Sequence, residues 1–208
     1  MVVIQAAALS FLLLSLTVHC AGAQKLETPL ALAVRNGDVA AVRELLHGGV
    51  NRDQVGHKDG DTPLMEAVSG GHLEIVELLL APAPSGLVAD VNFHRHDGDT
   101  ALQRGAFYGH LSIVQALLSA GADIDPQHFS TGASALMWAA YKGKLEVVQE
   151  LLARGAGNDL RNSQGLSARD LALQNGHEDV ASILDVAAAE RENDVDDWAE
   201  EEHQYDEF

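Results

Sequence analysis

Residues 62–80 read TPLMEAVSGGHLEIVELLL, and this pattern decides the fold. The threonine is typical of a helix N-cap, because its hydroxyl accepts a hydrogen bond from an amide left unpaired in the first turn. Proline suits the next position, since its φ is fixed and it has no amide to satisfy. Apolar residues then follow at helical spacing, the glycines permit a left-handed turn, and residues 73–80 form a second helix with one apolar face.

The same pattern occurs five times along the chain. Its N-cap residues are separated by 34, 38, 34 and 33 residues: Thr28, Thr62, Thr100, Ser134 and Ser167. A glycine turn and a pair of large aliphatic residues follow each copy in the same order. One helix pair of this size cannot bury its own apolar face, so the pairs are expected to stack on one another.

The repeat resembles that of the ankyrin family, whose unit has about 33 residues and a T-P-L-H-x-A signature. The resemblance covers residues 28–185. It implies an all-α helical repeat solenoid, with short β-hairpin or turn fingers between the repeats. It also implies a partner protein held on the fingers and the concave face. The expected domain is 24–189, with repeats at about 28–58, 59–96, 97–130, 131–163 and 164–189.

The sequence departs from this family pattern at one signature position. The histidine that follows T-P-L, which in the family helps to tie helix starts together, is replaced in every copy: Ala31, Met65, Gln103, Met137 and Asp170. Gln103 is expected to close a capping box with Thr100 instead. In the fifth repeat Arg169 replaces the inward leucine, as expected of a solvated C-terminal cap.

The composition argues against several classes of function. A net charge of -18 disfavours nucleic-acid binding, which needs lysine and arginine to displace phosphate counterions. The single cysteine, Cys20, leaves no disulfide framework and no zinc site in the expected domain. No catalytic motif or phosphate-binding loop is present. We therefore expect a protein that is not an enzyme and that uses no cofactor or metal.

The N-terminus is typical of a signal peptide. Residues 6–18 are an apolar run, and Ala21-Gly22-Ala23 matches the small-residue pattern before a cleavage site. Residues 1–23 are expected to direct the chain into the secretory pathway and to be removed before Gln24. The alternative is an uncleaved anchor, since residues 2–23 carry no charge and nearly reach the length of a membrane span. In that case the protein would be a membrane-tethered scaffold.

The C-terminus is strongly acidic. Residues 190–208 contain ten acids and one cation, Arg191, which gives a charge of -9. Such a density of like charge predicts a disordered tail. Two interpretations remain open: the tail keeps the protein soluble, or it binds a basic partner.

The resemblance also indicates which residues contact a partner. The variable helix positions just before the glycine turns hold Phe107, Tyr108, Tyr141 and Lys142, and Trp138 lies one turn earlier. The fingers contribute five further candidates: Lys58, Asp61, Arg95, Asp99 and Phe129. Exposed aromatic residues are the usual anchors of an interface. The alternative for Trp138 is that it packs between repeats.

Ten histidines raise the question of a metal site. Three lie at the same step of different repeats, so the repeat itself explains them: His72, His110 and His177. Those in the expected fingers show no second pair of ligands at fixed spacing, which disfavours a metal site. Protonation near pH 6.5 would make the fingers sensitive to pH, although exposed histidines in polar turns are the simpler interpretation.

Overall fold

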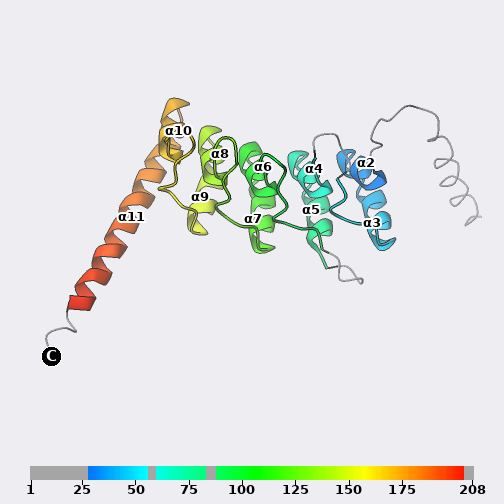
Figure 1. Ribbon diagram of the computed structural model, residues 1–208, viewed down its shortest axis with the longest axis horizontal. Helices are drawn as coiled ribbons and strands as arrows, with labels where there is room; N and C mark the ends of the chain where they lie inside the picture. Colours follow the sequence, from blue (N-terminus) through cyan, green and yellow to red (C-terminus); the bar gives the residue numbers. More distant parts are fainter. Residues whose placement is uncertain (1–27, 56–59, 83–87, 204–208) are drawn as a thin grey trace, which may run out of the picture.

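The computed structural model describes residues 28–55, 60–82 and 88–203, and these residues form five helix pairs stacked in chain order (Figure 1). The pairs are α2 (Pro29–Arg35) and α3 (Val39–His47), α4 (Pro63–Ser69) and α5 (Leu73–Leu80), α6 (Ala101–Tyr108) and α7 (Leu111–Ser119), α8 (Ala135–Tyr141) and α9 (Leu145–Ala153), and α10 (Ala168–Gln174) and α11 (Glu178–His203). Each helix contacts its counterpart in the next pair. The predicted all-α repeat solenoid is therefore confirmed.

The ends of the first helices form as the sequence predicts. In every pair the threonine or serine at the N-cap accepts a hydrogen bond from the amide three residues later. The turn to the second helix passes through a glycine with φ between 63° and 80°, a conformation that a Cβ atom would strain: Gly37, Gly71, Gly109, Gly143 and Gly176.

The histidines at this step of the repeat have a structural role. His72 lies against Gly37 of the preceding repeat, and His110 lies against Gly71 in the same way. A Cβ atom added at either glycine would lie 3.0 or 3.1 Å from the imidazole ring. His177 repeats the arrangement on Gly143. The glycines are therefore needed for close packing between repeats as well as for the turn.

One aliphatic core runs through the whole stack. The leucine after each N-cap dipeptide is almost completely buried in the first four repeats: Leu30, Leu64, Leu102 and Leu136. Arg169, which takes this position in the fifth repeat, lies at the surface and pairs with Asp185 of α11. Because none of the described residues stacks beyond α10 and α11, the charged side chain of Arg169 stays in contact with solvent. The expected C-terminal cap is confirmed.

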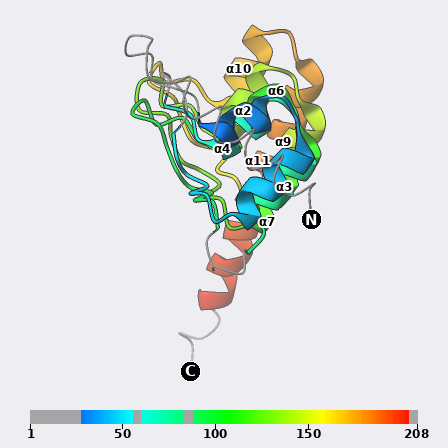
Figure 2. The same cartoon turned by 90° about the vertical axis from the view of Figure 1, so that its right-hand side faces the viewer.

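The fingers project to one side of the helices (Figure 2) and consist of turns rather than extended hairpins. Within the described residues the single antiparallel bridge joins His94 and Thr100. Backbone hydrogen bonds also join neighbouring fingers: the Phe129 amide donates to the Asp97 carbonyl at 2.8 Å, and the Ser163 amide donates to the Thr131 carbonyl at 2.9 Å. The fingers are thus held in a row alongside the helices.

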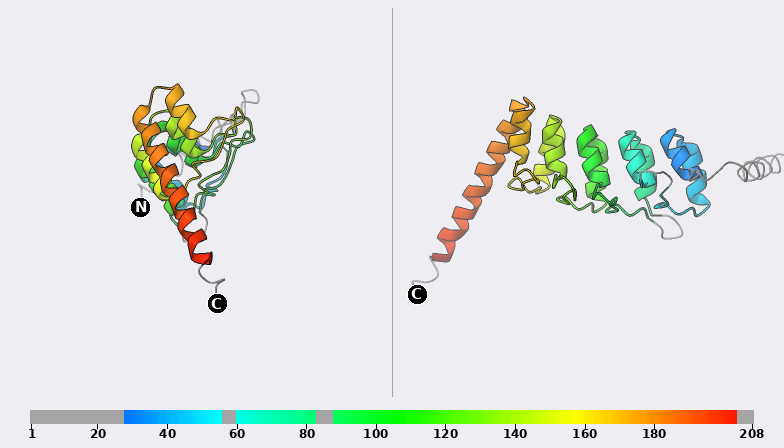
Figure 3. Two further views of the ribbon diagram at one scale, coloured as in Figure 1. Left: turned by 90° about the vertical axis from the view of Figure 1, so that its left-hand side faces the viewer. Right: turned by 45° about the horizontal axis from the view of Figure 1, so that its top comes forward.

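Residues 190–203, which the sequence predicts to be disordered, are described in the structure as part of a helix. Helix α11 continues to His203 and extends away from the stack (Figure 3). The run from Ala187 to Ala189 and the glutamates after it have high helix propensity, which outweighs the repulsion between like charges. Residues 204–208 lie outside the described residues.

Two further predictions also lie outside the described part of the chain: the signal peptide at residues 1–23, and Lys58. Across the ranges that are described, no helix combines the length and the apolarity needed to cross a membrane.

A buried arginine joins the first two repeats. Arg52 is 5% exposed, and its Nη1 donates to the carbonyl oxygens of Leu78, Leu79 and Ala81 at 3.2, 2.7 and 2.6 Å. These carbonyls lie at the C-terminal end of α5, beyond the reach of the amides of the helix itself, and the Leu79 carbonyl also accepts from the Ala89 amide at 3.2 Å. Burial lowers the pKa of Arg52 below its usual value, but an arginine remains charged in a protein.

Replacing Arg52 with alanine is expected to lower the free energy of unfolding by about 2–3 kcal/mol, because charge-assisted hydrogen bonds to buried carbonyls are lost. Urea unfolding followed by circular dichroism measures this change. The matched control is Arg43→Ala, since Arg43 makes a surface ion pair with Glu74 at 3.3 Å. Exposed pairs contribute at most about 1 kcal/mol. Equal losses in the two variants would contradict the capping role of Arg52.

Candidate functional site

The first helices leave one face free of the core. Residues spaced three and four apart on a helix share a face. In α6 this face carries Arg104, Phe107 and Tyr108, and in α8 it carries Trp138 and Tyr141, followed by Lys142. Because α6 and α8 pack side by side (Figure 1), the two sets of side chains are neighbours.

Four aromatic rings meet on this face. The Phe107 ring lies 5.2 Å from that of Tyr108 and 5.5 Å from that of Trp138, between ring centroids. Trp138 in turn lies 6.0 Å from Tyr141. The interplanar angles of 84°, 75° and 85° make all three contacts edge-to-face, a favourable geometry for aromatic pairs. We call Phe107, Tyr108, Trp138, Tyr141 and Lys142 the aromatic surface.

The aromatic surface is partly exposed to solvent. Tyr108 is 47% exposed and Tyr141 is 37% exposed. Phe107 and Trp138 are half-buried, and Trp138 packs against the core. Trp138 therefore packs between repeats, as the alternative interpretation states, while its ring also supports Phe107 and Tyr141. The lysine Nζ of Lys142 lies 4.4 Å from the centroid of Phe107 and 5.1 Å from that of Tyr141, which is a cation–π arrangement.

Three of the finger candidates take part in an internal ion network. Arg104 donates to both carboxylate oxygens of Asp61 at 2.7 Å, and its Nε donates to Asp99 at 2.7 Å. Arg95 lies 3.4 Å from Asp61. Burial by itself lowers the pKa of Arg104, but the hydrogen bonds that Arg104 donates to the two carboxylates outweigh burial and raise this pKa. Asp61, Arg95 and Asp99 therefore hold repeats two and three together, and their charges are already compensated.

Arg104 is the residue that sequence reasoning missed. Its two carboxylate partners occupy the same position in successive repeats, one residue before the N-caps Thr62 and Thr100. The sequence does show an aspartate at the same position before the first helix of two successive repeats, and this repetition could have indicated a shared cationic partner. The partner could not be inferred, because Asp61 and Arg104 are 43 residues apart in sequence.

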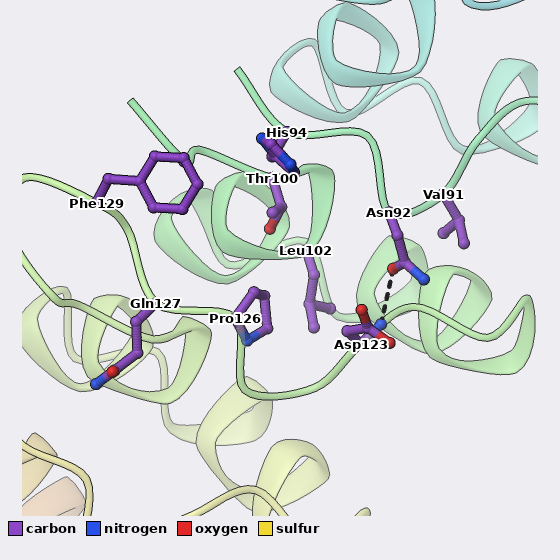
Figure 4. Close-up of a pocket in the computed structure, with 10 residues that line it drawn as sticks. Val91, Asn92, His94, Thr100, Leu102, Asp123, Pro126, Gln127 and Phe129 are labelled. Carbon is purple, nitrogen blue, oxygen red and sulfur yellow. Dashed lines mark hydrogen bonds between the residues drawn. The ribbon is translucent and has the colours of Figure 1, made fainter. Parts of the chain in front are cut away.

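The remaining finger candidate, Phe129, lies at a small hollow. Phe129 is 67% exposed, and its ring meets that of His94 edge-to-face at 5.4 Å. The hollow has a volume of about 200 Å³, and Figure 4 shows Phe129 and His94 on one side of it and Asn92 and Asp123 on the other. Pockets that hold drug-sized ligands measure about 300–1,000 Å³. This hollow suits a single side chain of a partner better than a small molecule.

Comparison with known sequences identifies the repeat. The family described as "Ankyrin repeats (3 copies)" matches residues 3–92, 30–128 and 106–194. The chain belongs to the ankyrin repeat family. It is also 41% identical, over 58 residues, to an ankyrin repeat protein of fowlpox virus (strain NVSL). That stretch covers 28% of this chain and 10% of the viral protein, so it supports the family and not a shared activity.

Ankyrin repeats are in general protein-binding modules without catalytic activity. Among the described residues of this ankyrin repeat domain, no three histidine, cysteine or acidic side chains gather as they would around a metal ion. The largest group of titratable side chains described above is the network of Asp61, Asp99, Arg95 and Arg104. Its hydrogen bonds and ion pairs are directed at one another, as in a structural link between repeats.

One titratable group borders the aromatic surface of the ankyrin repeat domain. The His110 ring stacks on Tyr108 with 5.9 Å between centroids. Burial lowers the pKa of His110, and the positive charge of Lys144 lowers it further, whereas a hydrogen bond with the Ser69 backbone acts in the opposite direction. The folded state therefore favours neutral His110. Its contribution to stability is complete above the unfolded-state pKa of about 6.5 and is lost as pH falls through the lower folded-state value.

A titration by nuclear magnetic resonance is expected to show His110 protonating below pH 6.5. Replacing Lys144 with glutamine is expected to raise the pKa of His110, because one of the two causes of its depression is removed. Arg154→Gln, which removes a charge from α9, serves as the control and is expected to leave His110 unchanged. A His110 pKa that does not respond to Lys144→Gln would exclude the lysine as a cause.

Proposed function

We propose that this ankyrin repeat protein is a non-catalytic scaffold that binds a partner protein through the aromatic surface and the adjacent fingers of the middle repeats. The supporting observation is the cluster of four aromatic rings on one face of α6 and α8, with Tyr108 and Tyr141 exposed. Large exposed aromatic side chains held rigidly by their neighbours are typical interface anchors. Phe129 and its hollow extend the proposed site onto the fingers.

The double variant Tyr108→Ala and Tyr141→Ala tests this proposal. Truncating two anchors is expected to lower partner affinity at least about tenfold, since a single such residue contributes on the order of 1–2 kcal/mol. The full chain and the variant are immobilised, partners are captured from an extract of the source cells, and the affinity of each identified partner is measured. Val186→Ala is the control, because Val186 is 58% exposed on α11 and outside the proposed site. Unchanged affinity in the double variant would place the interface elsewhere.

The location of the scaffold is a separate proposal. Residues 1–23 have the apolar run and the small-residue pattern of a cleaved signal peptide, which supports a secreted or lumenal protein. The alternative is a scaffold tethered to the membrane by residues 2–23. N-terminal sequencing of the exported protein distinguishes them: a chain starting at Gln24 supports cleavage, and a chain retaining Met1 supports the anchor.

The acidic C-terminal segment is a second candidate contact. Its charge of -9 over residues 190–208 suits a basic partner, and helix α11 carries it away from the stack (Figure 3). Removing residues 190–208 before the capture experiment tests this. A partner that the truncated chain no longer captures, but that the tyrosine double variant still captures, binds to residues 190–208.

A further inference from the structure

In the described part of the chain, Lys142 of the aromatic surface and its neighbour Lys144 differ from the other cations. Among the described residues, seven arginines form ion pairs with carboxylates: Arg35, Arg43, Arg95, Arg104, Arg154, Arg161 and Arg169. Arg52 and Arg191 donate to backbone carbonyls. In the same part of the chain, Lys142 and Lys144 form neither kind of contact. Both lie at one turn, on either side of Gly143.

The position of each lysine is fixed by packing. The ammonium group of Lys142 lies over the rings of Phe107 and Tyr141. The aliphatic part of Lys144 lies against Gly109, where an added Cβ atom would be 2.6 Å from its Cδ. Gly109 directly follows Tyr108 in sequence. The two lysines therefore border the exposed tyrosines.

No carboxylate occupies the corresponding surface positions of repeats three to five. These positions follow the N-cap by four, seven, eight and ten residues. They hold Arg104, Phe107, Tyr108, His110, Trp138, Tyr141, Lys142, Lys144, Leu171, Gln174, Asn175 and His177. The chain as a whole has 31 acids against 13 lysines and arginines, so these twelve positions without an acid contrast with the rest of the molecule. The carboxylates of Asp61 and Asp99 contact this face at Arg104.

The local charge decides what this face attracts. At physiological salt the Debye length is about 8 Å, so charges elsewhere on the acidic molecule are largely screened. A carboxylate within about 4 Å of either lysine interacts mainly with that lysine. A basic partner would instead meet two uncompensated positive charges at the centre of the site.

We propose that the aromatic surface binds an acidic segment of a partner protein, whose carboxylates pair with Lys142 and Lys144 while an apolar side chain packs on Tyr108 and Tyr141. This rests on the proposed function and adds the chemistry of the partner. A second copy of this chain also carries an acidic segment, at residues 190–208, and sedimentation distinguishes that occupant from a partner protein. The chain's own acidic helix α11 extends away from α6 and α8 (Figure 1).

The test uses two synthetic peptides of equal length that contain the same tryptophan and leucine residues. One is rich in aspartate and glutamate, and the other has asparagine and glutamine in their place. Fluorescence anisotropy measures the binding of each peptide to the full chain. The full chain is expected to bind the acidic peptide about fivefold more tightly, which is the scale of two exposed ion pairs.

The double variant Lys142→Gln and Lys144→Gln is expected to lose this preference. The control variant, Arg154→Gln and Arg161→Gln, removes the same charge from other surfaces and is expected to keep it. Equal binding of the two peptides by the full chain, or a preference that survives in the lysine variant, overturns the proposal. If, in that case, Tyr108→Ala combined with Tyr141→Ala still abolishes the binding of both peptides, the aromatic surface remains the binding site. Only the proposal that the partner segment is acidic is then overturned.

Sedimentation velocity of the full chain completes the test. A single monomeric species at all concentrations is expected. Self-association that disappears in the lysine variant would assign the surface to the acidic segment of a second copy, and would overturn the assignment to a partner protein.

Discussion

Replacing Gln103 with alanine is expected to lower the free energy of unfolding by about 3–4 kcal/mol, because several buried polar groups lose their partners at once. Gln103 is 1% exposed. Its Oε1 accepts from the Thr100 amide at 3.1 Å, closing the predicted capping box. Its Nε2 donates to the carbonyls of Pro126 and Ala133 at 2.9 and 3.0 Å, which links α6 to the next finger. Alanine leaves these groups unpaired and opens a cavity.

Two further variants separate these effects. Gln103→His introduces the residue that the family usually has here, and it is expected to retain more stability than alanine, since an imidazole can also donate and accept. Gln115→Ala is the control, because Gln115 is only part-buried and makes a single hydrogen bond, to Glu150. Thermal and urea unfolding measure all three. A loss below about 1 kcal/mol in Gln103→Ala would mean that water replaces the amide.

Replacing Asp61 with alanine is expected to lower the free energy of unfolding by about 2–3 kcal/mol, because a partly buried arginine loses its bidentate partner. Arg104 keeps its bonds to Asp99 and to the Ser69 hydroxyl, and Arg95 loses its contact at 3.4 Å. Although Asp61 is a finger residue of the kind the family uses to bind partners, its carboxylate is fully engaged within the chain. The substitution is therefore expected to reduce stability while leaving the affinity for a captured partner nearly unchanged.

A double substitution tests the cause. Replacing both members of a buried ion pair with apolar residues is often nearly neutral, whereas removing one member leaves an uncompensated charge. Asp61→Ala combined with Arg104→Met is thus expected to be more stable than Asp61→Ala alone. If the double variant is the less stable of the two, packing around Asp61, and not the unpaired charge of Arg104, accounts for the loss. A large loss of partner affinity in Asp61→Ala would instead indicate that Asp61 contacts the partner.

The sequence alone determined the repeat and the ends of its helices. N-caps at Thr28, Thr62 and Thr100, glycine turns and the capping box of Gln103 all depend on residues within a turn or two of one another, so a local pattern predicts them. The aromatic residues of α6 and α8 were also predictable as neighbours. A repeat of about 34 residues brings equivalent positions side by side once the fold is known.

Tertiary structure decided the roles of the polar residues between repeats. Asp61, Arg95 and Asp99 look like exposed binding residues in sequence, and only the approach of Arg104 shows that they form ion pairs within the chain. Two further contacts join residues more than twenty positions apart. Arg52 donates to the Leu79 carbonyl, and the side-chain amide of Gln103 donates to the Pro126 carbonyl. Within the described residues, Lys142 and Lys144 differ from the arginines because neither a carboxylate nor a backbone carbonyl pairs with them. Whether a charged side chain finds an oppositely charged partner depends on how neighbouring repeats pack. Local sequence does not encode the distance between side chains of different repeats.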